Sequence, residues 1–208
     1  MRRYATEFVG TFFLVFTVCT AVLSRAPLAP LAVGAILAAM VFAGGHVSGG
    51  HYNPAVSLAA YVRGKLSAVD LGLYAAAQFV GGVVAALVAN YVVTAQAEKF
   101  TVEGPAIGRA FVAELLFTFA LASVVLNVAT SKDHPNNSFY GLAIGFTVLA
   151  GAVAVGGISG GAFNPAVGLG VLVAGIAGAS TLWIYLVATL AGGAAAGFVF
   201  RLLNPDDK

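Results

Sequence analysis

Charged residues are scarce in this sequence. Asp, Glu, Lys and Arg together make up 9% of its 208 residues, whereas a typical soluble domain carries about 25%. Hydrophobic residues make up 60% of the chain, which excludes an ordinary soluble fold and indicates an integral membrane protein. The length accommodates about six spanning helices of ~20 residues each. We therefore expect no separate catalytic domain.

Cysteine is nearly absent, and basic residues form no cluster. Cys19 is the one cysteine, which excludes a disulfide within the chain, and its position in an apolar run favours a packing role. The net charge of +2 arises from scattered residues, so nothing suggests nucleic-acid binding. We find no nucleophile–base pair and no metal-ligand cluster. The sequence therefore predicts no catalytic residues, no metal and no cofactor.

Six long apolar runs are predicted to be membrane-spanning helices. They are Tyr4–Leu23, Leu28–Gly45, Ala68–Ala95, Arg109–Thr130, Ser138–Gly156 and Ser180–Leu203. Because each is far longer than the ~10-residue alternating strands of membrane barrels, an all-α membrane protein is expected. The first run resembles a signal peptide, but Glu7 interrupts it and no convincing cleavage site follows. We expect it to be retained as a helix.

Two short stretches repeat each other 111 residues apart. His46–Ala60 reads HVSGGHYNPAVSLAA and Gly157–Val171 reads GISGGAFNPAVGLGV. In each, a Gly-rich bend leads to Asn, a preferred N-cap residue, and then to Pro, which suits the first helical position. Each predicts a helix of about ten residues, too short to cross the ~30 Å hydrocarbon core. Two such short helices in matching positions indicate a solute site at the bilayer midplane.

The spanning runs repeat as well. Glu7–Phe12 (EFVGTF) in the first run corresponds to Glu114–Phe119 (ELLFTF) in the fourth. We predict one channel-forming domain with repeats at residues 1–95 and 109–203 and a linker at 96–108. Three spans per repeat is an odd number, so the repeats must be inverted. Lys and Arg are more numerous on the side that holds both termini, which predicts cytoplasmic termini.

The Gly-rich bends predict a lumen within the membrane. Irregular backbone at this depth occurs only where protein buries it or a water-filled cavity receives it. Successive carbonyl groups are expected to line this lumen, namely those of Gly49, Gly50, His51, Gly160, Gly161 and Ala162. The two short helices would direct positive N-terminal dipoles at it, which repels cations and admits neutral molecules. Asn53 and Asn164 are expected to cap these helices and point their amide N–H₂ groups into the lumen.

Ionisable residues within spans have two interpretations. Glu7 and Glu114 could form a proton relay, or each carboxylate could accept backbone N–H groups from the bent loop of its own half. Their matched positions and the lack of opposite charges favour the structural role, which we also expect for Gln78 and His46 as buried residues. His46 and His51 flank the first bend. Zinc binding there is conceivable, but packing or lining the cytoplasmic mouth is favoured.

The two boxes Asn53-Pro54-Ala55 and Asn164-Pro165-Ala166, with a Glu early in the first and fourth spans, resemble the aquaporin (major intrinsic protein) family over essentially the whole chain. The resemblance implies an aquaporin-like bundle of six spanning helices plus two half-helices. It also implies a homotetramer with one pore per subunit, set in the lipid bilayer of the plasma or inner membrane. Its partners would be water and small neutral solutes, which it would conduct passively.

The resemblance also places an outer selectivity filter at Val33, Ala152, Gly161 and Val167. Val33 stands where water channels of the family carry an aromatic residue, and Val167 stands where the family usually has Arg. Such a filter is wide and apolar, because a strict water filter needs a narrow constriction with fixed hydrogen-bond donors. It therefore favours glycerol, urea and metalloid acids, with arsenous acid first, since bacterial relatives without this Arg resemble metalloid channels.

Three alternatives remain open at this point. A water-selective channel is possible if a bulky side chain such as Phe163 or Phe139 narrows the pore. At the position of Gly168, glycerol-conducting relatives usually carry Asp, so this sequence departs from their pattern there. A proton-coupled transporter would use Glu7 and Glu114, and a scaffold protein would retain the fold without conducting anything.

Overall fold

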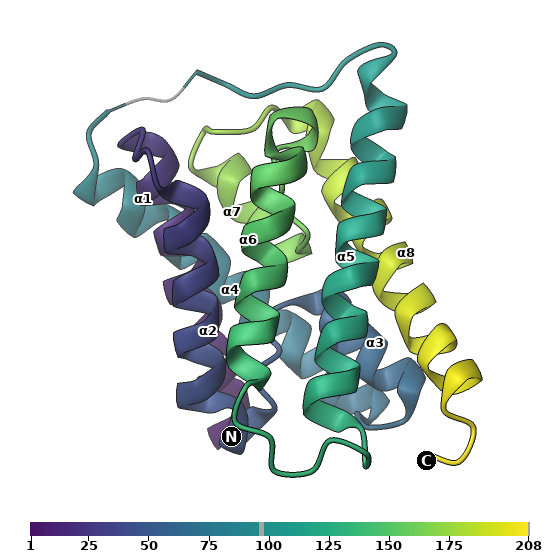
Figure 1. Ribbon diagram of the computed structural model, residues 1–208. Helices are drawn as coiled ribbons and strands as arrows, with labels where there is room; N and C mark the ends of the chain where they lie inside the picture. The colour runs from purple at the N-terminus through teal and green to yellow at the C-terminus, as the bar shows by residue number, and fades with distance from the viewer. Residues whose placement is uncertain (96–97, 208) are drawn as a thin grey trace.

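The computed structural model describes residues 1–95 and 98–207, and within them the chain forms eight helices (Figure 1). They are α1 Arg2–Leu23, α2 Ala29–Ser48, α3 Pro54–Arg63, α4 Ala68–Val92, α5 Ala106–Thr130, α6 Tyr140–Ser159, α7 Pro165–Val173 and α8 Ala179–Leu203. Six are long and apolar enough to cross a membrane. The other two are the short helices α3 and α7. The predicted all-α architecture is confirmed.

The helix boundaries differ from the prediction by a few residues. Helices α2 and α6 continue for three residues past the predicted ends and stop where Gly49 and Gly160 adopt left-handed conformations (φ 92° and 90°), a common helix C-cap. Helix α5 starts at Ala106, directly after Pro105, so the connection between the halves covers residues 93–105 rather than 96–108. Residues 96 and 97 of this predicted linker lie outside the described residues.

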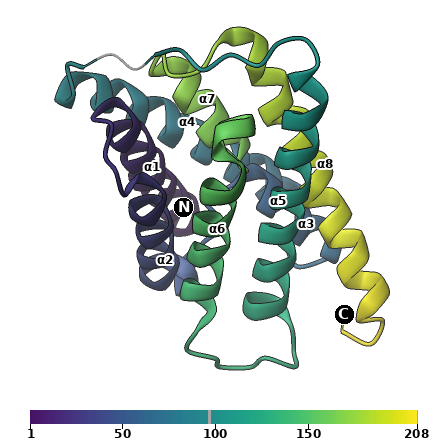
Figure 2. The same cartoon turned by 45° about the horizontal axis from the view of Figure 1, so that its top comes forward.

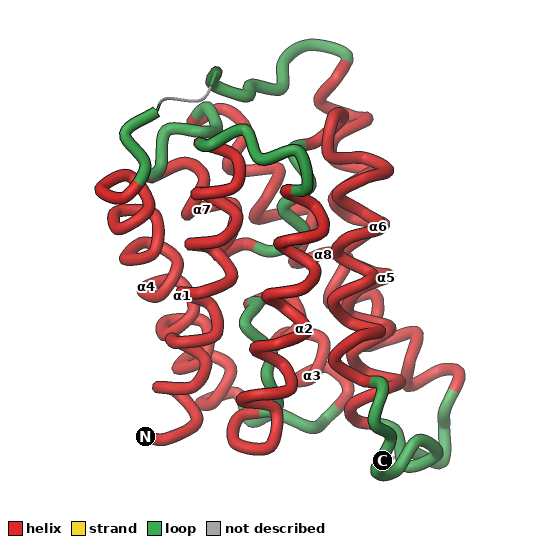
Figure 3. The backbone as a smooth tube through the Cα atoms, turned by 60° about the vertical axis from the view of Figure 1, so that its left-hand side comes forward, coloured by secondary structure: helices red, strands yellow, loops and turns green. Residues whose placement is uncertain are grey.

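The two short helices enter the bundle from opposite ends. Both chain termini lie at one end of the bundle, where α3 also lies, whereas α7 lies toward the other end (Figures 1 and 3). We call these the termini end and the opposite end. Each short helix packs mainly on the long helices of the other half, α3 on α8 and α7 on α4. The two halves are therefore interleaved rather than laid side by side.

Two glycines allow this interleaving. A Cβ on Gly82 of α4 would lie 2.9 Å from the carbonyl oxygen of Ala166, and one on Gly193 of α8 would overlap the carbonyl oxygen of Ala55. Both carbonyls belong to the residue that follows Asn-Pro in a short helix. Small residues permit such close helix contacts where no hydrophobic effect drives helices together. The spanning helices thus support the short helices directly behind their N-termini.

We expect the substitution Gly193→Ala to destabilise the protein by about 1–3 kcal/mol, because the added methyl forces α8 away from α3. The measurement is thermal unfolding in detergent. Gly72→Ala on α4 is the matched control, since a Cβ there meets nothing within 4 Å and alanine raises helix propensity. Equal effects of the two substitutions would show that close packing is not the role of Gly193.

The connection between the halves is attached to the end of α7. It crosses over the opposite end of the bundle from α4 to α5 (Figure 2). The backbone N–H of Phe100 donates to the carbonyl of Ile176 (2.7 Å), and the N–H of Gly178 donates to the carbonyl of Phe100 (2.9 Å). The N–H of Val102 donates to Oγ1 of Thr181 (3.1 Å). These bonds hold the C-terminal end of α7 in place.

Candidate functional site

A narrow cavity of about 30 Å³ lies where α3 and α7 meet. Three polar side chains line it, those of His51, Asn53 and Asn164. The other lining residues are apolar, namely Leu14, Val18, Val33, Leu37, Val56, Leu121, Val125, Ile144, Val148, Gly161, Ala162 and Val167. Of the described residues that line it, none carries a formal charge. The cavity can therefore hold small neutral molecules without a charged partner.

The two asparagines cap the short helices as the sequence predicts. Asn53 is extended (φ −157°), and its side-chain oxygen accepts the N–H of Ala55 at 2.8 Å. Asn164 has the same conformation (φ −159°) and accepts the N–H of Ala166 at 2.9 Å. Capping by Asn satisfies one of the free N–H groups at a helix start. Each amide oxygen is thereby fixed, and with it the direction of the N–H₂ group.

Each asparagine also binds the loop of the other half, which the sequence did not indicate. Nδ2 of Asn53 donates to the carbonyl of Phe163, and Nδ2 of Asn164 donates to the carbonyl of Tyr52, both at 2.9 Å. Tyr52 and Phe163 adopt left-handed conformations (φ 47° and 48°). Since an amide carries two N–H groups, one per asparagine remains for the cavity, where the prediction assigned both. The reciprocal bonds join the N-termini of the two short helices.

Glu7 holds the first bend from behind. Its Oε1 accepts the hydroxyl of Ser48 (2.7 Å) and the N–H of His51 (3.0 Å). Its Oε2 accepts the N–H of Tyr52 (2.6 Å) and Nε2 of Gln78 (2.8 Å). Glu7 and Gln78 are both fully buried. With four donors bound to one buried carboxylate, Glu7 orients the loop.

Glu114 holds the second bend in the same way but with fewer donors. It accepts the hydroxyl of Ser159 (2.7 Å), the N–H of Ala162 (3.0 Å) and the N–H of Phe163 (2.7 Å). Thr189 stands where the first half has Gln78, and its hydroxyl binds the carbonyl of Tyr185 in its own helix. This bonding pattern is the one expected of a structural role.

The two bends leave backbone carbonyls available. Gly49, Gly50, Gly160 and Gly161 all have positive φ, between 64° and 92°. Within the described part of the chain, no protein donor is bound to the carbonyls of residues 49–51 or 160–162. Such groups need water or a ligand as partner.

Only part of this predicted carbonyl series reaches the narrow cavity. His51, Gly161 and Ala162 line it. Gly49 lies outside it, lining a separate hollow at the termini end. Gly50 and Gly160 are also missing from the lining of the cavity. The predicted carbonyl series therefore extends beyond the residues that line the cavity.

The histidines at the first bend occupy different surroundings. Nδ1 of His51 lies 3.0 Å from Oγ of Ser57, and its ring packs edge-on against Tyr74. His46 was predicted to be buried, and this is wrong. Helix α2 continues to Ser48, which places His46 in its last turn at the termini end, where the side chain is exposed. In the described residues, no group of three ligating side chains could hold a metal.

Three of the four predicted filter residues line the cavity. They are Val33, Gly161 and Val167. Ala152 instead packs against the second bend, its Cα 3.5 Å from the position of a Cβ on Gly161, and Val148 one turn earlier reaches the cavity. Spacing along the sequence places a residue on a helix but does not give the rotation of that helix.

The two phenylalanines considered as constrictions do not line the cavity. The Phe163 ring is buried, packs on Phe117 with 5.3 Å between ring centroids, and lies against Gly151. Phe139 is 47% exposed at the start of α6. At Gly168, a Cβ would lie 2.5 Å from the Cβ of Tyr185, so an acidic side chain does not fit there.

Most of the aliphatic residues that line the cavity were not predicted from the sequence, although their spacing from the two buried glutamates is regular. Leu14 and Val18 lie seven and eleven residues after Glu7, and Leu121 and Val125 lie equally far after Glu114. Residues at these intervals share one helix face. The spacing from each buried carboxylate could therefore have identified the cavity face of α1 and α5.

Comparison with known proteins agrees with this geometry. The sequence model of the family described as "Major intrinsic protein" matches residues 1–200. The chain belongs to the major intrinsic protein family. Like other members of this family, it is a channel for small solutes and water and not an enzyme. Its six apolar spanning helices make it a multi-pass membrane protein.

Individual relatives of the channel cover its whole length. It is 37% identical over 217 residues to the "Glycerol uptake facilitator protein-like 6" of Lactiplantibacillus plantarum, with 100% of both chains covered. It is 31% identical to Nodulin-26 of Glycine max, covering 100% of this chain and 80% of that protein. The aquaglyceroporin of Plasmodium falciparum has the same fold (TM-score 0.82, 23% identity, 98% and 97% of the two chains).

Proposed function

We propose that this channel conducts arsenous acid or other metalloid acids, glycerol and urea together with water, through a filter that lacks Arg. The observation that carries the proposal is the presence of an uncharged valine, Val167, in the cavity lining. It lines the cavity, is 4% exposed, and follows the second Asn-Pro-Ala box, where the family usually has Arg. Without that cation the passage has no fixed positive donor and no long side chain at this level.

The polar and apolar walls of the cavity suit hydroxylated neutral solutes. The free N–H groups of Asn53 and Asn164 are the donors, and the unpaired backbone carbonyls are the acceptors. Branched aliphatic side chains supply the remaining surface. We assign the filter to Val33, Gly161 and Val167, with Ala152 contributing by its small size behind Gly161. Glu7, Glu114 and Gln78 support the bends.

A water-selective channel is the second candidate, and the size of the cavity favours it. About 30 Å³ admits roughly two water molecules, at about 10–15 Å³ each on the same measure. A larger solute requires aliphatic side chains such as Leu37 and Val148 to change rotamer.

Stopped-flow swelling of proteoliposomes tests these candidates. Water, glycerol, urea and arsenous acid are compared as permeants, with empty liposomes as the control. We expect flux of all four that is linear in concentration and indifferent to a proton gradient. Water flux alone would favour the water-selective candidate. Saturable flux that disappears when the proton gradient collapses would favour a transporter that uses Glu7 and Glu114.

Protons should remain excluded despite the missing Arg. The N-termini of α3 and α7 meet at the cavity, and each carries about half a positive charge. We expect weaker proton exclusion than in relatives with the Arg. The measurement is the pH inside proteoliposomes, reported by an enclosed pH-sensitive dye, under a potassium diffusion potential. A proton current well above that of empty liposomes would contradict this assignment of the helix dipoles.

We further propose that residues 1–95 and 109–203 are inverted repeats of one domain. Both termini lie at the same end of the bundle (Figure 1), and we assign that end to the cytoplasm and the protein to the cell membrane. We also propose a homotetramer with one pore per subunit, which the mass of the detergent-solubilised protein tests.

A further inference from the structure

A buried ion pair outside the cavity fixes the far end of α3. Arg63 is the last residue of this short helix, and its side chain is fully buried. Its guanidinium donates to Oγ1 and the carbonyl oxygen of Thr130 (2.9 and 3.1 Å), and to Oδ1 and the carbonyl oxygen of Asp207 (2.6 and 3.1 Å). It also lies over the Phe200 ring, 4.5 Å from its centroid.

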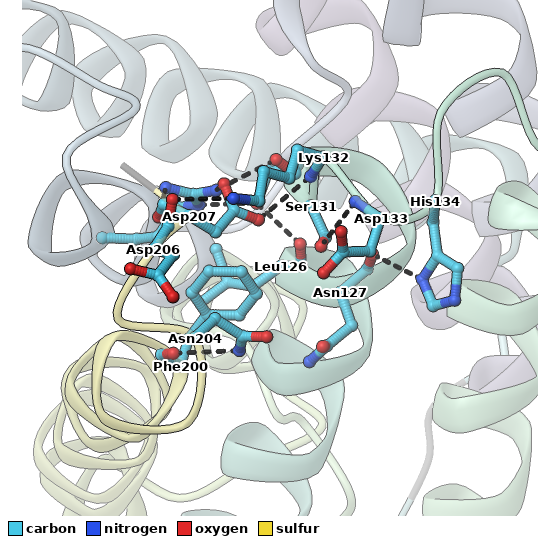
Figure 4. A network of polar contacts seen from close by, with 12 residues as sticks. Leu126, Asn127, Ser131, Lys132, Asp133, His134, Phe200, Asn204, Asp206 and Asp207 are labelled. Carbon is cyan, nitrogen blue, oxygen red and sulfur yellow. Dashed lines mark hydrogen bonds and ion pairs between the residues drawn. The ribbon is translucent and has the colours of Figure 1, made fainter.

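The Asp207 carboxylate also binds segment 204–207 to the residues that follow α5 (Figure 4). Oδ2 of Asp207 accepts the backbone N–H of Lys132 at 3.0 Å. Nζ of Lys132 in turn donates to the carbonyl of Asp206 at 2.8 Å. The side chain of Asp207 is 3% exposed. Arg63 and Asp207 thus connect three parts of the chain at the termini end, namely α3, the end of α5 and segment 204–207.

Stability alone is a weak reason for such a pair. Removing two charges from water carries a desolvation cost that their attraction often fails to exceed. The position of the pair suggests a geometric role. Arg63 terminates the ten-residue helix whose other end carries Asn53, and Asn53 is bonded to the carbonyl of Phe163. A helix of this length is about 15 Å long and rigid, so a displacement at Arg63 moves Asn53.

The other short helix is fixed by a different device. The end of α7 is held by the backbone bonds of Phe100 to Ile176 and Gly178. Of the two ion pairs recorded among the described residues, Arg63–Asp207 and Arg3–Asp70, neither involves α7. Among the described residues, the C-terminal end of α3, unlike that of α7, is therefore held in part by a carboxylate in a segment outside the helices.

We propose that Arg63 is a positioning residue for permeation, and that segment 204–207, through Asp207, sets the place of Asn53 in the cavity. The channel then conducts at its full rate only while this segment is bound. The proposal is independent of which solute is physiological, because it concerns the position of α3.

The ion pair persists over the pH range in which flux is measured. Burial raises the pKa of Asp207, but the hydrogen bonds from the Lys132 backbone and from Arg63 outweigh it and hold the pKa at about 2. Because this pKa is lowered in the folded protein, the stabilisation is complete above the ordinary pKa of 3.8 and is lost as the pH falls through about 2. Substitution is therefore the way to break the contact.

The experiment measures water permeability per folded channel, and its activation energy, in proteoliposomes containing Asp207→Ala or Arg63→Met. We expect the permeability to fall by about threefold or more and the activation energy to rise, because Asn53 shifts into the cavity. Arg63→Lys should have an intermediate effect, since it keeps the charge but loses the fork that binds both partners. If an Arg63 variant fails to fold, Asp207→Ala still gives the answer.

The matched control is Asp70→Asn, which breaks the exposed pair Arg3–Asp70 between α1 and α4. It should leave water permeability per folded channel unchanged. A merely structural role of Arg63 would lower the yield of folded protein but not the permeability per channel or its activation energy. That result would overturn the proposal.

Discussion

Val167→Arg should lower the permeability to glycerol, urea and arsenous acid relative to water by at least about tenfold, equivalent to ~1.4 kcal/mol. Val167 lines the cavity at the start of α7. An Arg there adds a long side chain with fixed donors, which narrows the passage and holds water in place of larger solutes. The measurement is stopped-flow swelling of proteoliposomes with each permeant, normalised to the amount of folded channel.

Val167→Met separates charge from bulk. It is unbranched and uncharged, so it should reduce the flux of large solutes much less than Arg does. If Arg leaves the ratio of large-solute to water permeability unchanged, Val167 is not part of the filter. If Met and Arg lower it equally, the missing cation is not what makes this passage permissive.

Glu114→Gln should destabilise the fold around the second bend and lower water flux. Its carboxylate accepts one hydroxyl and two backbone N–H groups in a fully buried position. The neutral amide brings an N–H₂ group against at least one of these donors, and the loss of charge-assisted hydrogen bonds costs about 3 kcal/mol. The second bend would then relax, and with it the carbonyl of Phe163 that Asn53 binds. We expect a lower unfolding temperature in detergent and at least about tenfold less water flux.

The control for this substitution is Glu103→Gln, the same chemical change at an exposed position before α5. It should affect neither unfolding nor flux. A Glu114→Gln protein that conducts normally but no longer responds to a proton gradient would contradict the structural role and support the proton-coupled alternative. Glu7→Gln should be tolerated less well, because Glu7 has a fourth donor in Gln78.

Local features of the sequence determined the class of protein and its elements. The low charge and the length of the apolar runs were sufficient for six spanning helices, which the structure confirms. The Asn-Pro pairs predicted the starts of α3 and α7 at the observed residues. These predictions succeeded because each depends on a short stretch of sequence. Hydropathy is a property of one apolar run, and N-capping and the fixed φ of Pro involve adjacent residues.

Tertiary structure decided which side chains meet. The rotation of α6 brings Val148 rather than Ala152 to the cavity, and the extension of α2 leaves His46 at the surface. The reciprocal bonds of Asn53 and Asn164, and the pairing of Arg63 with Asp207, join residues more than 100 positions apart. Helix rotation and contacts across the halves depend on packing over the whole bundle, which no short stretch of sequence encodes.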